Sequence, residues 1–244
     1  MTVRFRFALF TLCIVFLGLM APSVSAQAPP SGAVFDLATS SQLPSTGILS
    51  TYTLFNTSFV GDGNTEYVSF AFREVPAFWS IDDTSVTAGA DPTNLLGNPG
   101  FEQGATTGPA DVGTNFPDGW GRWIQPVDLS SIGVVASNSQ PGGCTQANSG
   151  TQFWCDGSVE GYDGIDQAIS TTSGVTYNVS FYLNDNSGND IATSGDGIDM
   201  LVYAGDTLPL GSQPISATPE PSSLVLLGSG LAALGGLVRR KLKA

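Results

Sequence analysis

Hydrophobic and polar positions alternate along much of the middle of the chain with a period of two. In the clearest run, residues 174–183, every second position is apolar or aromatic: Val175, Tyr177, Val179, Phe181 and Leu183. Residues 67–73 alternate in a similar way. Successive side chains of a strand point to opposite faces, so both runs predict strands that bury one face.

Shorter segments rich in β-branched and aromatic residues predict further strands. They lie at 34–37, 49–55, 59–60, 132–136, 152–154, 161–169 and 200–204. Gly, Asn, Asp and Pro separate them, as in the turn 61–64, and no helical periodicity of useful length appears between residues 27 and 217. The pattern predicts an all-β fold, a β-sandwich of the jelly-roll type. A disordered linker protein is the alternative at 30 Gly and 15 Pro, but aromatic residues at period two favour a packed core.

Both ends of the chain differ from the middle. Arg4 and Arg6 precede an apolar run and a small-residue site, which predicts a helical signal peptide cleaved between Ala26 and Gln27. Near the other end, residues 224–238 are uncharged and mostly apolar, and four basic residues follow. This end predicts a short transmembrane helix with its basic side in the cytoplasm, and therefore an exported body.

These signals divide the chain into consecutive segments. We expect a signal peptide at 1–26, a loose lead-in at 27–47, a β-sandwich at 48–210 with a hinge near 88–93, a linker at 211–221, and a transmembrane and basic tail at 222–244.

The exported body is strongly acidic. The chain has 21 acidic and 8 basic residues, and of the basic ones only Arg73 and Arg122 lie between the two ends. Such a surface repels phosphate backbones, so we expect no nucleic acid partner, but it suits divalent cations. The chain has no histidine, which removes the usual general base and the usual zinc ligand. We therefore expect a protein that is not an enzyme.

Two cysteines remain after removal of the signal peptide. Cys144 and Cys155 are separated by ten residues. In an exported protein this arrangement predicts one local disulfide.

The C-terminal segment contains a Pro-Glu-Pro tripeptide. Pro219, Glu220 and Pro221 precede the apolar run and its basic end. In this order the parts resemble the PEP-CTERM sorting signal of Gram-negative bacteria. The resemblance implies processing by an exosortase, attachment to the membrane before processing, and a place at the cell surface or in the extracellular matrix, often beside exopolysaccharide production. An ordinary C-terminal membrane anchor is the alternative.

Several sequence motifs (phrases) of the body resemble those of a galactose-binding-like jelly roll, the fold of many carbohydrate-binding modules. They are residues 94–102, Gly119-Trp120 and residues 174–181, with 80–86 similar to the closing phrase of such a domain. Here the closing phrase precedes the opening one. The chain is therefore either a shortened module followed by a complete one, or one permuted sandwich. We favour one sandwich, because about 40 residues bury too little surface to fold alone.

The same resemblance implies a structural calcium ion. Glu102 of the opening phrase and Asp82 or Asp83 of the closing phrase match the family's ligands. Calcium takes six to eight oxygens, so carbonyl groups of the same loops would complete the shell. The alternative is that these acids cap turns and face water.

A glycan site would need aromatic faces with polar groups beside them. The candidates are Trp154 and Tyr162, with Asp163 and Gln167 as polar partners. For each aromatic residue, a place in the core is the alternative.

From the sequence we expect an exported, exosortase-sorted protein with a non-catalytic sandwich, structural or adhesive in the exopolysaccharide matrix. A carbohydrate-binding module with a defined groove and, further away, a glycoside hydrolase are the alternatives.

Overall fold

The computed structural model describes residues 28–75, 77–104, 117–125, 133–139, 141, 143–159, 161–185, 187–194, 197–209 and 213–214. The predicted signal peptide, its cleavage site at Ala26 and Gln27, the Pro-Glu-Pro tripeptide and the predicted tail helix lie outside these residues. In the part that is described, no helix has the length and apolar character needed to cross a bilayer.

The described chain is built from strands, with one short 3₁₀ helix, η1 (Ile191–Thr193). The strands are β1 (Phe35–Asp36), β2 (Thr53–Val60), β3 (Thr65–Glu74), β4 (Trp79–Ala88), β5 (Gly121–Ile124), β6 (Val134–Ser137), β7 (Gln152–Asp156), β8 (Asp163–Ser170), β9 (Thr176–Asp185), β10 (Ile198–Gly205) and β11 (Gln213–Pro214). The all-β prediction is confirmed for these residues.

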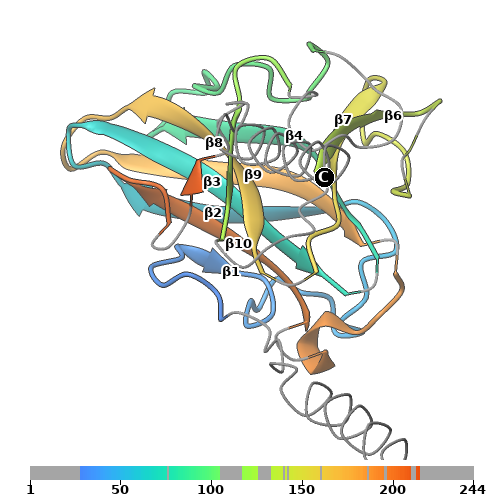
Figure 1. The fold of residues 1–244 in the computed structure, drawn as a ribbon. Coiled ribbons are helices and arrows are strands. Elements are labelled where there is room, and N and C mark those ends of the chain that lie inside the picture. Colours follow the sequence, from blue (N-terminus) through green and yellow to red (C-terminus); the bar gives the residue numbers. More distant parts are fainter. Residues whose placement is uncertain are drawn as a thin grey trace, which may run out of the picture.

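The strands form two antiparallel sheets. One has the order β1-β10-β3-β8-β5-β11 and the other the order β2-β9-β4-β7-β6. Figure 1 shows the long strands of both sheets running side by side through the body. Apolar side chains of the two inner faces meet between the sheets, as in a β-sandwich.

The pairing of the strands is nested. β1 pairs with β10, β2 with β9, β3 with β8 and β4 with β7, so the chain folds back along itself like one long hairpin. A double-stranded ribbon wrapped in this way gives a jelly-roll-like sandwich. The early strands pair beside the late ones within one sandwich, because β3 lies between β10 and β8. The predicted hinge is a turn after β4, where Gly89 N donates to Thr176 O at 2.8 Å.

The core lies where the alternating side chains point inward. Tyr177, Val179, Phe181 and Leu183 of β9 are buried, as their period predicts. The prediction of a single buried face for residues 67–73 was incomplete. Ala71 of β3 packs on the opposite face of its sheet in a second cluster, with Trp123, Tyr162, Leu201 and Tyr203. A strand in the middle of a sheet that is covered on both faces is buried on both.

Candidate functional site

Strand β4 contains an irregularity at the predicted calcium ligands. Its register with β9 shifts between Asp82 and Ser85, and Asp83 has a φ of 49°. A shift of this kind is a β-bulge, which turns side chains away from the regular alternation. Asp82 is fully buried and Asp83 is half-buried, and both carboxylates face the loop that ends at β7.

The two aspartates hold this loop through hydrogen bonds. Asp82 Oδ2 accepts from Asn148 N at 2.8 Å and from Ser149 N at 3.1 Å. Asp83 accepts from Asn148 Nδ2 at 2.8 Å and from Ser149 Oγ at 2.7 Å. Burial raises the pKa of Asp82 to about 7, even though the Ser149 amide favours the charged form.

Glu102 holds the next residues of the same loop. Its Oε1 accepts from Thr151 N at 2.7 Å and Gln152 N at 2.9 Å, and its Oε2 accepts from Thr151 Oγ1 at 2.9 Å. Gly150 lies against this carboxylate with a φ of 62°, and a Cβ there would collide with Glu102. Glycine is therefore required on both backbone and packing grounds.

A tight turn positions Glu102. Asn98 has a φ of 50°, its Oδ1 accepts from Gln103 N at 3.0 Å, and its Nδ2 donates to Gln103 O at 2.8 Å. Phe101, with a φ of 58°, is fully buried and packs its ring 5.3 Å from that of Trp120. The ring of Phe101 packs in the core, and the side chain of Glu102, the next residue, faces the loop 148–152.

The three predicted calcium ligands are neighbours in space. A Cβ added to Gly100 would lie 3.6 Å from Asp83, 3.7 Å from Asp82 and 4.0 Å from Glu102. Each carboxylate accepts hydrogen bonds from the loop 148–152, and among the described residues these three do not form a group of ligand atoms within metal-sharing distance. Calcium at this position stays a prediction.

The disulfide prediction is confirmed. Cys144 and Cys155 are bonded, and their Cα atoms are 5.9 Å apart. The bridge closes the segment that contains the loop 148–152. It therefore restricts the position of the loop groups that donate hydrogen bonds to the three acids.

The aromatic candidates for a glycan site do not lie on the surface. Trp154 is fully buried, and its Nε1 donates to Asp156 Oδ2 at 3.0 Å. Tyr162 is 1 % exposed, and its hydroxyl donates to Asp199 Oδ2 at 3.3 Å. Stacking of a sugar on either ring is not compatible with this geometry, because both faces are covered by protein.

The polar candidates have structural partners as well. Asp163 is buried and forms an ion pair with Arg122 at 3.1 Å. Burial, and next the charge of Asp163, raise the pKa of neighbouring Asp156 well above its usual range. Gln167 accepts from Gly97 N and donates to Gly97 O, both at 2.7 Å. The four predicted glycan contacts therefore belong to the interior.

A shallow hollow that the sequence did not reveal lies beside the disulfide segment. It has a volume of about 360 Å³ and is lined by Ser50, Thr51, Tyr52, Thr145, Gln146, Ala147 and Asn184. Thr145 Oγ1 donates to Asn184 Oδ1 at 3.1 Å, which joins the two sides of the hollow. No sequence pattern links residues 50–52 with 145–147, so only the fold brings them together.

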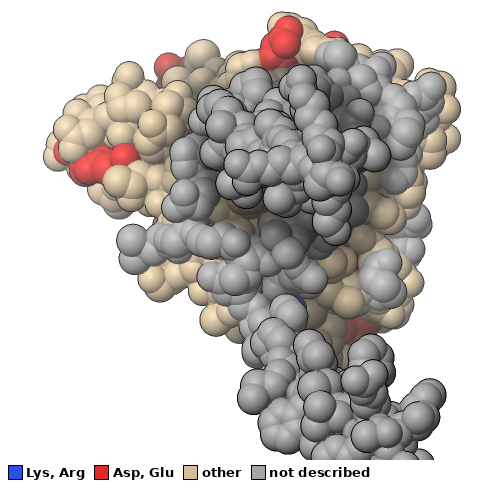
Figure 2. All heavy atoms as spheres, viewed as in Figure 1, with Lys and Arg blue, Asp and Glu red and all other residues tan. Residues whose placement is uncertain are grey.

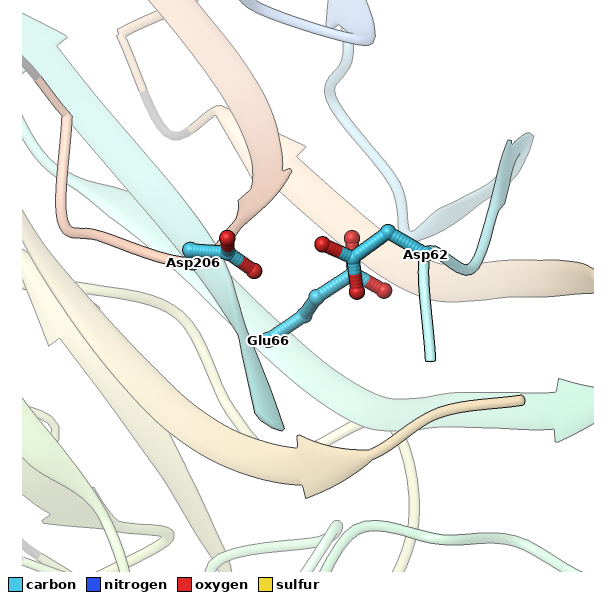
Figure 3. A group of neighbouring side chains, drawn as sticks. All are labelled: Asp62, Glu66 and Asp206. Carbon is cyan, nitrogen blue, oxygen red and sulfur yellow. The ribbon is translucent and has the colours of Figure 1, made fainter. Parts of the chain in front are cut away.

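A second acidic group also escaped the sequence reasoning. Asp62, Glu66 and Asp206 each offer one oxygen, and these oxygens all lie within 4.8 Å of one another (Figure 3). Hydrogen bonds from Asn64 lower the pKa of Asp62, whereas the hydrogen bond to Asp62 raises the pKa of Asp206. The alternating acids and amide at 62, 64 and 66 could have drawn attention, but Asp206 could not.

The surface of the described residues is acidic. Arg73 and Arg122 are the only basic residues in the described part, and they are 3 % and 6 % exposed. Figure 2 shows separate groups of acidic side chains on one face and almost no basic surface among the residues drawn in colour.

Comparison with known proteins identifies the tail. Residues 217–241 match the PEP-CTERM protein-sorting motif. This match supports an exported, exosortase-sorted protein of the cell surface that is anchored in the membrane before processing. Neither a curated protein nor a solved structure matches the chain.

Proposed function

We propose that the body of this protein acts by non-covalent contact with extracellular polysaccharide after exosortase sorting, as an adhesive or structural component of the matrix. The sorting motif at residues 217–241 is the observation that carries the proposal, since it assigns the body to the outside of the cell. The sandwich then acts through its surface, by binding and not by chemistry.

The charge of the body restricts the polysaccharide. Both basic residues of the described part are buried, so an acidic glycan would be repelled unless divalent cations bridged the two surfaces. A neutral glycan meets no such barrier. We therefore propose neutral or cation-bridged polysaccharides as partners.

The shallow hollow favours a second, more specific candidate, a carbohydrate-binding module with a defined groove. Tyr52 supplies an aromatic ring there, and Gln146 supplies an amide that can pair with sugar hydroxyls. The amide of buried Asn184 is already bonded to Thr145 and to Leu49 O. The hollow takes the place of the buried Trp154 and Tyr162 as the candidate glycan contact.

Expression of the full chain in two bacterial hosts, with and without an exosortase, tests the proposal. We expect C-terminal shortening and release from the membrane only in the first host, measured by intact mass and cell fractionation. The double variant Pro219→Ala/Pro221→Ala should remain full-length, whereas Pro214→Ala, outside the matched residues, should be processed normally. Equal mass of the wild-type protein in both hosts would contradict exosortase sorting.

The same cultures test the glycan contact. Released protein should co-sediment with the isolated polysaccharide of the host, and Gln146→Ala in the hollow should reduce the bound fraction several-fold. Ser173→Ala, in an exposed turn, is the control. If Gln146→Ala and Ser173→Ala bind like the wild type, the contact lies elsewhere, and if the wild type does not bind, the polysaccharide proposal is wrong.

A further inference from the structure

Three carboxylates from two distant parts of the chain meet at one end of the sandwich. Asp62 lies in the turn between β2 and β3, Glu66 is the second residue of β3, and Asp206 directly follows β10. β10 pairs antiparallel with β3 and Gly205 is opposite Tyr67, so the register places Asp206 beside Glu66. In Figure 3 the carboxyl groups of Asp62 and Glu66 lie against each other, and that of Asp206 points toward them.

Glu66 is the critical member of this group. It is 5 % exposed, and its Oε2 is buried and has no hydrogen-bond partner among the described residues. On β3 it pairs with Ile169 of β8, a buried aliphatic residue. A buried carboxylate oxygen without a partner is strongly unfavourable unless a positive charge or a donor compensates it.

The described protein offers no basic side chain for this purpose. Arg122 is paired with Asp163, and Arg73 lies over the ring of Tyr162 at 5.9 Å. Arg73 is also seven residues from Glu66 along β3, roughly 23 Å in an extended strand. Asn64 donates to both oxygens of Asp62, at 2.7 and 2.9 Å, which orients that carboxylate but leaves Glu66 uncompensated.

We propose that Asp62, Glu66 and Asp206 bind one divalent cation, and that this cation is calcium. Three carboxylate oxygens converge here, and calcium prefers hard oxygen ligands at 2.3–2.6 Å. Two oxygens bound to one calcium lie at most about 5 Å apart, which agrees with the 4.8 Å spread of this group. Asp62 and Asp206 are exposed, so water can complete the shell on the outer side.

The bound cation joins the β2–β3 turn to the end of β10. Beyond Asp206 the chain continues toward the sorting motif at 217–241. The site therefore fastens the end of β10, before the chain returns to the sheet as β11. It is independent of the proposed polysaccharide contact, because the hollow is lined by other residues.

Calcium titration of the full chain in detergent micelles, after removal of metal ions, tests the site. We expect one calcium per chain by calorimetry, with a Kd on the order of 10⁻⁴ to 10⁻³ M, as in extracellular modules. Unfolding followed by tryptophan fluorescence should show a Tm higher by roughly 3 to 8 °C at 10 mM calcium than in chelator.

Matched Glu→Gln variants locate the ion. Glu66→Gln should weaken calcium binding at least tenfold and, in chelator, raise the Tm, because the uncompensated buried charge is gone. Asp206→Asn should also weaken binding, whereas Glu102→Gln should leave it unchanged. Absence of calcium binding in the wild type would overturn the proposal, and so would binding that survives Glu66→Gln but is lost in Glu102→Gln.

Discussion

The two acidic groups of the sandwich differ in what faces them. Asp82, Asp83 and Glu102 receive hydrogen bonds from the loop 148–152, most of them from backbone N–H groups. Glu66, beside Asp62 and Asp206, has a buried oxygen with no partner in the described protein. Both groups formed where distant segments meet, but only the first has a loop folded over it.

This difference shows two ways in which a protein compensates a buried carboxylate. A loop with inward-pointing amides supplies partial positive charge from the chain itself, whereas a group without such a loop depends on an external cation. Protonation is a third way. It applies to acids elsewhere in the core, and the raised pKa of Asp82 indicates that it also contributes in the first group. Three experiments sharpen the distinction.

The largest change in the free energy of unfolding should come from pH, because some buried acids are neutral in the folded protein when they carry a proton. Burial and then the charge of Asp185 raise the pKa of Glu74 to about 8, and burial and then the charge of Asp36 raise that of Asp199 to about 7. The folded state therefore holds these protons more tightly than the unfolded state does. Their stabilising contribution is complete below about pH 4 and is lost as the pH rises through 7 to 8.

We expect the Tm in chelator to be higher at pH 5 than at pH 8, with a difference in unfolding free energy on the order of several kcal/mol. Glu74→Gln should flatten this dependence, because it removes the group with the most strongly raised of these pKa values. A free energy of unfolding that rises from pH 5 to pH 8 would show that these carboxylates are ionised and compensated in the folded protein.

The disulfide should come next, because it fixes the loop that serves the first acidic group. In the double variant Cys144→Ser/Cys155→Ser, loss of a cross-link that spans 11 positions should cost about 3 kcal/mol, or roughly 6 to 12 °C in Tm. Thermal unfolding with and without reductant measures this.

A second readout ties the disulfide to the acids. Amide hydrogen exchange at Asn148, Ser149 and Thr151 should become faster in the double variant, while exchange in β9 should change only as much as global stability does. Unchanged protection of the three loop amides would mean that the acids hold the loop without the bridge.

The smallest effect should come from the individual acids of the first group. Asp82→Ala should cost about 2 kcal/mol, because Asn148 N and Ser149 N lose a buried acceptor, and Glu102→Ala about 1 kcal/mol, because its loop is exposed. Chemical denaturation gives both values. Glu66→Gln in chelator should instead raise the free energy of unfolding. If all three variants lost stability by the same amount, the two acidic groups would not differ in how they are compensated.

The sequence predicted much of the strand content and little of the site. Period-two alternation identified β9, and the aromatic and β-branched segments identified β1, β7 and β10, because these properties are local. The extent of β2 was missed, since Asn56, Thr57 and Ser58 read as a break although they pair with β9 along the whole strand. Local patterns also cannot show which face is covered, and this is why Trp154 and Tyr162 were interpreted as candidates for the surface.

The sequence predicted the first acidic group but not the second, because local patterns do not show which distant segments meet. Asp82, Asp83 and Glu102 belong to phrases that resemble a known fold, and they do lie together around Gly100. The register of β10 against β3 brings Asp206 to Glu66, and a register between strands so far apart in the chain is not written in either strand alone. The shallow hollow also forms only when residues 50–52 and 145–147, far apart in the chain, come together in the fold.

Strand β11 has a mechanical consequence for a protein tethered by its tail, because it lies between β10 and the tail in the chain. It is the edge strand of its sheet and pairs antiparallel with β5 over two residues, whereas β10 is held between β1 and β3. Tension on the anchored end therefore reaches this short edge strand first, and its few ladder bonds should yield at a lower force than those of β10.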